Sequence, residues 1–479
     1  MQETLLNIVA TANKYLSDYI LIILLVGAGL FFSFKTRFVQ VRCFGEGMKK
    51  VFGNISLRGG KNKSGLSSFQ ALATAIAAQV GTGNIVGASG AILTGGPGAI
   101  FWMWVIAFLG MATIYAEATL AQETRVTDAD GEIHGGPVYY IKRAFPNGFG
   151  TFLAIFFAVA VIFALGFMGS MVQSNSIAES SNTAFGIPNY VVGIVLAIVC
   201  AIIFIGGIQR IASVTEKIVP IMATLFLIGG LVVLLSNLSG LVEAVKMIFK
   251  FAFTPQALIG GGIGAAIKTA ISQGAKRGLF SNEAGMGSTP HAHAMANVEK
   301  PHDQGVVAMI GVFIDTFVVL TMTALVIITT LYTGNDGLGN MAPDAYQAVI
   351  SGTEPFMNIA LSKTNAMQIA MTSGFPSFMS GVGKGFVAIC LLFFAFTTII
   401  GWNFFGKVNV QYLFKNNKKA TVVYSVIAIV FLVLGTLASN DLVWELTDFF
   451  NYLMVIPNVI ALIALYKLVV KNSKSNKDK

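Results

Sequence analysis

The residues whose types and spacing suggest chemistry are concentrated in Gln79–Ile85, inside the apolar segment 66–93. Gly81, Gly83 and Asn84 are poor helix formers, and each glycine costs about 1 kcal/mol relative to alanine in a helix. Hydrocarbon tolerates an unwound backbone only where it lines a buried or wet cavity. The amides that begin a second half-helix would bind an anion, and the carbonyls that end the first would bind a cation. The alternative is close helix packing, which also favours glycine.

The composition indicates a polytopic membrane protein. Of the 479 residues, 55% are hydrophobic and 11% are charged, whereas soluble domains carry about 25% charged residues. The net charge of +9 does not indicate a nucleic-acid partner, because the basic residues lie in short loops beside apolar segments. Cys43, Cys200 and Cys390 are far apart in the sequence and predict neither a disulfide framework nor a metal site.

Eleven apolar segments have the length of about 20 residues that a membrane-spanning helix needs. They are 18–34, 67–93, 99–119, 149–173, 190–208, 214–235, 257–288, 306–331, 383–405, 420–437 and 443–469. The loop 35–63 holds eight basic residues and one acid, so it is predicted to be cytoplasmic, with the N-terminus outside and the C-terminus inside. The outer loop around Lys246 and Lys250 is predicted to carry a surface helix, and 334–380 to form a lid.

Ten segments remain after the first, and they divide into two sets of five that each begin with an interrupted segment. Because five is odd, the second set crosses the membrane inverted relative to the first, an arrangement that indicates a transporter binding site. The second interruption is expected within 260–264 or 272–278, and Ser272–Gly274 is the preferred position. The predicted units are an N-terminal helix with a basic loop, two five-helix repeats and a basic tail: 1–66, 67–236, 237–470 and 471–479.

Several charged and histidine residues are weaker candidates for chemistry. No G-x-x-x-x-G-K-[ST] motif is present, so the sequence does not indicate ATP as the energy source. Acids inside membrane spans are functional candidates, although Glu117 could simply pair with a nearby base. The remaining groups are Lys276, Arg277 and Glu283, expected to form an inner ion-pair cluster, and His291, His293 and His302, expected to be solvated.

The span 383–405 carries two adjacent hydroxyls at mid-helix. Thr397 and Thr398 either bond back to their own helix or join backbone carbonyls around a hard cation such as Na⁺. Trp402, one turn further, would wall an apolar pocket for a small side chain. Gln173 and Asn175 end an earlier span, and their amides either reach the same cavity or lie at the membrane interface.

The run 95–104, Gly-Gly-Pro-Gly-Ala-Ile-Phe-Trp-Met-Trp, resembles the alanine or glycine:cation symporter family. The runs 81–85 and 277–285 also resemble this family. The resemblance covers essentially the whole chain. It implies an all-α integral membrane protein with a LeuT-like 5+5 inverted repeat, two discontinuous helices and one extra N-terminal helix. It also implies sodium-coupled symport of alanine or glycine by alternating access, in the bilayer of a bacterial or archaeal plasma membrane.

The resemblance also implies roles for individual residues. The amides of Thr82 and Gly83 would hold the substrate carboxylate, and Asn84 would be an amide ligand at a second sodium position. One sodium ion, the coupling ion, would be held by Ala77, Val80, Thr397 and Thr398. The full set of expected substrate-binding residues is Gln79, Thr82, Gly83, Asn84, Asn175, Ser272, Gln273, Gly274 and Trp402. No enzymatic cofactor is expected.

Three other functions are compatible with parts of the sequence. A proton-coupled carrier would use Asp315 or Glu117 as the proton relay. An ion channel could line a pore with glycine-rich backbone, but such channels are usually built from repeated subunits around one axis. A membrane-embedded enzyme would need convergent catalytic groups at one depth, and the sequence indicates none.

The predicted topology can be tested by cysteine labelling. A cysteine introduced at Lys61 should react with impermeant reagents only from the cytoplasmic side, because the basic loop is retained there. Labelling in intact cells would contradict the assignment and reverse the direction of both repeats.

Overall fold

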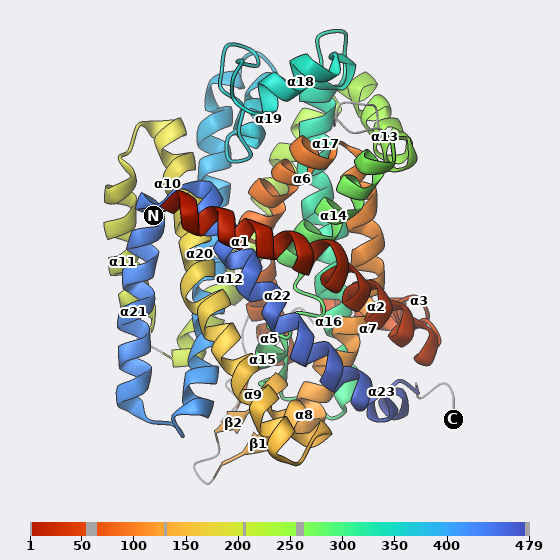
Figure 1. Ribbon diagram of the computed structural model, residues 1–479, viewed down its shortest axis with the longest axis vertical. Helices are drawn as coiled ribbons and strands as arrows, with labels where there is room; N and C mark the ends of the chain where they lie inside the picture. Colours follow the sequence, from red (N-terminus) through yellow and green to blue (C-terminus); the bar gives the residue numbers. More distant parts are fainter. Residues whose placement is uncertain (1, 54–64, 129–131, 205–206, 255–262, 475–479) are drawn as a thin grey trace.

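The computed structural model describes residues 2–53, 65–128, 132–204, 207–254 and 263–474, which form a tall bundle of helices with one small hairpin (Figure 1). Gly260–Gly262, part of the expected second interruption, lies outside the described residues, as does Lys61. Within the described residues, eight helices are long and apolar enough to cross a membrane, or nine if one bent pair is a single span. Two of the expected spans instead correspond to a shorter apolar helix, Asn189–Phe204, and to Ile263–Asn282.

The N-terminal helix is longer than the predicted span 18–34. It is continuous through α1 (Gln2–Tyr15), η1 (Leu16–Leu21) and α2 (Ile22–Lys35), and it runs diagonally across the front of the bundle in Figure 1. Two short helices follow, α3 (Val39–Arg42) and α4 (Phe44–Phe52).

The first predicted interruption is confirmed. The segment consists of α5 (Ser68–Gln79), the π-helical turn η2 (Gly83–Gly87) and α6 (Ala88–Gly95), and the two halves are bent by 47°. Ser67 and Gln70 form a capping box that fixes the start of α5, because each side chain satisfies a backbone amide of the other. The break therefore separates two well-defined half-helices.

The rest of the first half surrounds this broken helix. Its elements are α7 (Gly98–Thr124), β1 (Val126–Thr127), β2 (Ile133–His134), α8 (Pro137–Ala144), α9 (Gly148–Val161), η3 (Ile162–Gly169), α10 (Ser170–Phe185), α11 (Asn189–Phe204) and α12 (Gly207–Ser236). β1 and β2 pair antiparallel, with Val126 opposite His134. The expected helix around Lys246 and Lys250 is present as α13 (Leu238–Phe253).

The second interruption is not found at its preferred predicted position. α14 (Ile263–Asn282) is helical through Ser272–Gly274, and the chain leaves the helix only after Asn282, before α15 (Pro290–Ala294). The prediction of a break at 272–274 is therefore wrong. Gly274 serves packing instead, because a Cβ there would lie 2.6 Å from the Cβ of Trp102 on α7.

The remaining elements complete the second half. They are α16 (Pro301–Val312), η4 (Phe313–Leu320), α17 (Thr321–Ile327), η5 (Ile328–Tyr332), η6 (Leu338–Asn340), α18 (Pro343–Ile350), α19 (Ala366–Gly374), η7 (Ser380–Val382), α20 (Gly383–Leu413), α21 (Lys418–Leu437), α22 (Asn440–Ala464) and α23 (Tyr466–Asn472). α18 and α19 lie at the top of Figure 1. The Tyr346 hydroxyl of α18 donates to the carbonyl of Leu93 at 2.7 Å, which attaches this segment to the end of α6.

The outer helices of the bundle expose apolar side chains on its surface, whereas the central helices are buried. α11 and α21, at the left edge of Figure 1, each expose aliphatic residues at four-residue spacing, which is one helix face. These residues are Ile194, Ile198 and Ile202 on α11 and Val422, Val426 and Val430 on α21. By contrast, every residue from Ala71 to Ser89 is buried. A bilayer would cover the exposed faces, and the broken helix lies in the interior.

Candidate functional site

Side chains replace the backbone partners that the first break removes, one from the broken helix itself and one from α10. The Oδ1 atom of Asn84 accepts from the amide of Gly81 at 3.0 Å, and the Oε1 atom of Gln173 accepts from the amide of Thr82 at 3.1 Å. Both side chains are fully buried. Buried protein groups thus satisfy the amides of Gly81 and Thr82, as a non-helical segment at membrane depth requires.

Oxygen atoms from two helices converge beside the break. The hydroxyl oxygen of Thr398 lies 2.9 Å from the carbonyl oxygen of Ala77 and 3.5 Å from that of Val80. It also lies 3.1 Å from the carbonyl oxygen of Phe394. One hydroxyl proton cannot satisfy three carbonyl oxygens. The Thr397 hydroxyl instead bonds back to its own helix, to the carbonyls of Phe393 and Phe394 at 3.0 Å each. An uncharged, buried group of oxygens is the environment that a hard cation prefers.

The glycines of the break are required by close contacts. A Cβ on Gly81 would overlap the Thr398 hydroxyl, and a Cβ on Gly83 would lie 3.0 Å from both the Phe280 ring and the Cα of Ser281. Neither glycine has a positive φ. The absence of a side chain therefore lets α20 and α14 approach the broken backbone.

The second break is held by a buried carboxylate. Glu283, Gly285 and Gly287 have φ values of 58°, 92° and 80°, and they reverse the chain after α14. Glu117 accepts from the amides of Gly285 and Gly287 at 3.0 and 2.9 Å, and Asn458 donates to it at 2.6 Å. The expected basic partner of Glu117 is thus replaced by backbone amides that form an anion-binding turn.

The two breaks meet each other through Asp315. Its carboxylate accepts from the Nδ2 atom of Asn84 at 2.7 Å and from the hydroxyl of Ser281 at 2.9 Å. Next to it, the Nε2 atom of Gln79 donates to the carbonyl of Asn282 at 2.7 Å. Asp315 has no exposed surface. This one carboxylate therefore connects η2, α14 and η4.

Trp402 contacts the second break, where the chain turns after α14. Its indole Nε1 donates to Glu283 at 2.6 Å, and its ring lies edge-on to Phe280 with centroids 5.7 Å apart. Glu283 also accepts from Ser288. The expected cluster of Lys276, Arg277 and Glu283 is therefore wrong, because the two bases pair elsewhere. Their partners are Asp18 for Lys276, at 3.7 Å, and Asp448 for Arg277, at 2.6 Å.

Aromatic and charged side chains pack against one another between α14 and the start of α22. The rings of Phe280 and Trp444 have centroids 4.6 Å apart, and the Arg277 guanidinium lies 4.7 Å from the Trp444 ring. Further out, Lys363 pairs with Asp441 at 2.9 Å.

Some expected site residues lie elsewhere. Asn175 donates to the carbonyls of Gly435 and Ala438 at 2.9 and 3.0 Å, so its side chain ties α10 to the end of α21. Ser272 donates to Asp18 at 2.6 Å. Gln273 packs against the end of α6, where a Cβ on Gly95 would lie 3.2 Å from the Gln273 Cβ. The placements of Ser272 and Gln273 follow from the continuation of α14 through 272–274.

His291, His293 and His302 are expected from the sequence to be solvated, but all three are buried. His291 and His293 are each 1% exposed. His291 contacts Asn409 at 2.9 Å, and His293 contacts Gln304 at 2.8 Å. Sequence spacing gave no indication of these partners, because they come from α20 and α16.

Three buried polar atoms at the first break form no hydrogen bond within the described part of the chain. They are Gln79 Oε1, Thr82 Oγ1 and Gln173 Nε2. Buried polar atoms are normally paired, so each unpaired group calls for an explanation. A small polar ligand that offers both donors and acceptors would satisfy them.

Comparisons with known proteins agree on one family. A family model described as the sodium:alanine symporter family matches residues 2–479. The sodium/alanine symporter AgcS of Methanococcus maripaludis is 38% identical over 470 residues, which cover 98% of this chain and 96% of AgcS. The putative sodium/proton-dependent alanine carrier protein YrbD of Bacillus subtilis is 40% identical over 465 residues, which cover 96% of this chain and 90% of YrbD.

Solved structures identify the fold. The crystal structure of MhsT in complex with L-phenylalanine superimposes with a TM-score of 0.55 at 13% identity, and the match covers 85% of this chain and 99% of MhsT. At this level of identity the match concerns the fold alone.

The close approach of α14 to the first break gives a testable prediction about stability. Gly83→Ala should lower the midpoint of thermal unfolding in detergent, because the added Cβ meets backbone atoms of Ser281 and such overpacking costs roughly 1–3 kcal/mol. Gly27→Ala is the matched control, since a Cβ at Gly27 has no neighbour within 4 Å. Equal midpoints for the two variants would contradict the tight contact.

Proposed function

The chain belongs to the sodium:alanine symporter family and is therefore a transporter rather than an enzyme, and from this premise we propose that it couples Na⁺ entry to uptake of alanine or glycine at the first break. The observation that carries the proposal is the convergence of Ala77, Val80, Phe394 and Thr398 oxygens beside an unwound helix. Cations and small anionic groups are bound at such breaks in secondary transporters.

The sodium ion is proposed to bind between α5 and α20. Its ligands would be the carbonyl oxygens of Ala77 and Val80 and the hydroxyl oxygens of Thr397 and Thr398, with the Phe394 carbonyl as an additional ligand. Binding would require the Thr398 hydroxyl to turn its proton away from the Ala77 carbonyl. Na⁺ binding would then hold the first half-helix against α20.

The amino acid is proposed to bind at the unpaired polar atoms of the same break. Its carboxylate would bind the amides of Thr82 and Gly83, and would displace the Gln173 oxygen that now accepts from Thr82. The free Nε2 of Gln173 and the hydroxyl of Thr82 would then donate to the ligand, and Gln79 Oε1 would accept from its ammonium group. Trp402 would limit the side chain to alanine or glycine.

A second coupling ion is proposed at Asp315 and Asn84. The Asp315 carboxylate and the hydroxyl of Ser281 supply oxygens within hydrogen-bonding distance of each other, next to Asn84. This group would take a second Na⁺ or a proton. Proton coupling is the alternative function, and it is favoured by the burial of Asp315 at the contact between the two breaks.

The finer architecture is also proposed. The chain would cross a bacterial or archaeal plasma membrane eleven times, with the N-terminus outside and the C-terminus inside. The units 67–236 and 237–470 would be inverted repeats of five helices in a LeuT-like arrangement, after the N-terminal unit 1–66 and before the tail 471–479. The division is supported by the broken helix at the start of the first unit and by the turn after α14 near the start of the second.

Uptake into proteoliposomes tests the proposed function. An inward Na⁺ gradient should drive accumulation of labelled alanine and glycine, and K⁺ in place of Na⁺ should not. A pH gradient without Na⁺ distinguishes proton coupling: accumulation driven by protons alone would replace the sodium proposal. Asp315→Asn should weaken the coupling to whichever ion drives uptake.

Thr398→Ala should raise the Na⁺ concentration for half-maximal alanine uptake by roughly 10- to 100-fold. The reason is that removal of one oxygen leaves the buried charge under-coordinated, and a bond to a charged group is worth about 1.5–3 kcal/mol. Thr398→Ser keeps the oxygen and is the control, with a mild effect. Unchanged sodium dependence in the alanine variant would place the cation elsewhere.

Trp402→Ala should admit larger amino acids while weakening alanine uptake. A single methylene is worth only about 1–3 kcal/mol in an apolar pocket, so rejection of large side chains depends on steric exclusion by the indole ring. Competition of unlabelled valine and leucine against labelled alanine measures the change. Trp402→Phe loses the bond to Glu283 but keeps a ring, so it should retain the original order of preference. The same order in Trp402→Ala would mean that another residue limits the pocket.

A further inference from the structure

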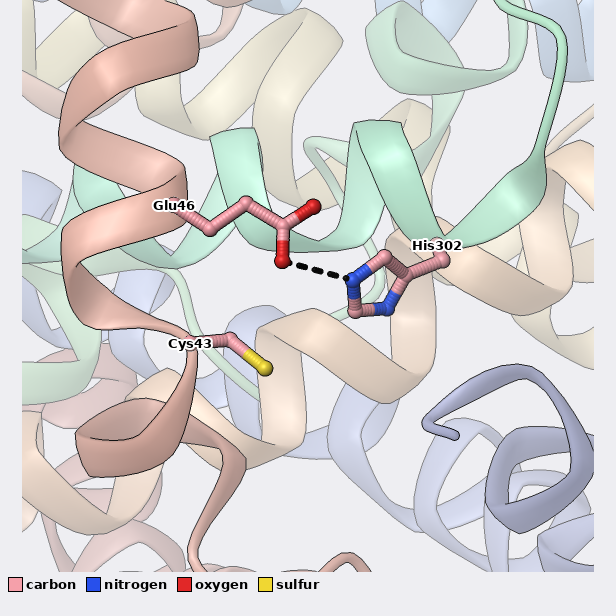
Figure 2. Close-up of side chains that lie close together, drawn as sticks. All are labelled: Cys43, Glu46 and His302. Atoms are coloured by element: carbon pink, nitrogen blue, oxygen red, sulfur yellow. Dashed lines mark hydrogen bonds and ion pairs between the residues drawn. The ribbon is translucent and has the colours of Figure 1, made fainter. Parts of the chain in front are cut away.

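A second group of potential ligands lies apart from both helix breaks. Cys43 and Glu46 come from the junction of α3 and α4, and His302 comes from the first turn of α16 (Figure 2). One ligand atom from each residue lies within 4.8 Å of the other two. Cys43 is 2% exposed and His302 is 8% exposed, whereas the Glu46 side chain is 37% exposed. The cluster therefore opens to solvent on the Glu46 side.

The distance between His302 and Glu46 is compatible with two ligands of one four-coordinate metal. His302 Nε2 and Glu46 Oε2 are 3.4 Å apart, which is longer than the usual range of about 2.7–3.2 Å for such a bond. Two ligands at about 2.0–2.1 Å from a tetrahedral zinc ion are separated by about 3.3 Å. Cys43 lies on the same side of the cluster as the His302 ring, below the Glu46–His302 contact in Figure 2.

The other ring nitrogen of His302 already has the partner that a metal ligand needs. The Nδ1 atom lies 2.8 Å from the hydroxyl of Tyr115, a fully buried residue of α7. When Nδ1 donates to this hydroxyl, the lone pair of Nε2 faces Glu46 and Cys43. Such a hydrogen bond fixes both the tautomer and the orientation of metal-binding histidines.

The neighbouring cation does not block the cluster. Lys50 lies 3.9 Å from the other carboxylate oxygen of Glu46, and it is closer to Asp303, at 3.1 Å. Arg42 directs its guanidinium to the carbonyls of Thr36 and Ser473. The Oε2 side of Glu46 thus remains directed at His302.

We propose that Cys43, Glu46 and His302 bind a divalent transition metal of the zinc class, with a solvent molecule as the fourth ligand. A thiolate with an imidazole favours such metals, whereas Mg²⁺ and Ca²⁺ prefer oxygen ligands alone. Cys43 releases its thiol proton to solvent on binding, and the metal replaces its present contact. Bound metal joins α4 to α16, the helix that continues into η4.

The test uses the full-length protein, purified in detergent, with Co²⁺ and Zn²⁺ as probes. Co²⁺ should produce the near-ultraviolet absorption of a cobalt–thiolate bond, and Zn²⁺ should displace it and raise the midpoint of thermal unfolding. Cys43→Ser should abolish the absorption, and Glu46→Gln and His302→Asn should weaken zinc binding. Tyr115→Phe should weaken it by roughly 10- to 100-fold, because only the supporting hydrogen bond is lost.

Two variants are matched controls. Cys200→Ser removes a distant buried thiol, and His134→Asn disrupts the group Asp128, Glu132 and His134, which contains no thiol. Both should keep the cobalt–thiolate absorption. Absence of this absorption in the wild-type protein, or its persistence in Cys43→Ser, would overturn the proposal. Should His302→Asn fail to fold, Cys43→Ser and Glu46→Gln decide the result.

Discussion

The structure depends on the need to satisfy backbone polar groups where two helices unwind inside the membrane. At the first break the replacement partners are side chains, with Asn84 and Gln173 accepting from the amides of Gly81 and Thr82. At the second break a carboxylate, Glu117, accepts from Gly285 and Gly287. Hydrocarbon offers no alternative partner, so protein side chains must supply one: Asn84 from the broken helix itself, and Gln173 and Glu117 from neighbouring helices. The packing of α7, α10 and α14 around the breaks follows from this constraint.

The same constraint leaves specific atoms available to a ligand. At the first break, the partners are polar groups that a ligand can exchange, such as the Gln173 oxygen on the Thr82 amide. At the second break, Glu117 is held by three donors and has a structural role. Asp315 connects the two regions, because its partners Asn84 and Ser281 belong to different broken helices. An ion bound there would alter the contact between the two helices.

The sequence predicted the first break correctly but placed the second too early. Both predictions used glycine content, and glycine has two roles in membrane helices. Gly81 and Gly83 lie at an unwound segment, whereas Gly274 lies in a continuous helix that packs closely on Trp102. The true second break is marked by Glu283, Gly285 and Gly287, within the run 277–285 that also carries the family resemblance. Composition in a window cannot distinguish these roles, because the difference lies in the neighbouring helix.

By itself, the sequence determined the membrane class, the family and the unwound segment 79–85, because hydropathy, charge bias and glycine spacing are local properties of the chain. It also paired Thr398 with the carbonyls of Ala77 and Val80, through the resemblance. Only the tertiary structure decided that Gln173 reaches Thr82 while Asn175 does not, since residues two positions apart in a helix face nearly opposite neighbours. The meeting of Cys43 with His302, and of Asn84 with Asp315, was likewise decided by packing. These residues are more than 200 positions apart, and only the folded arrangement of helices brings them together.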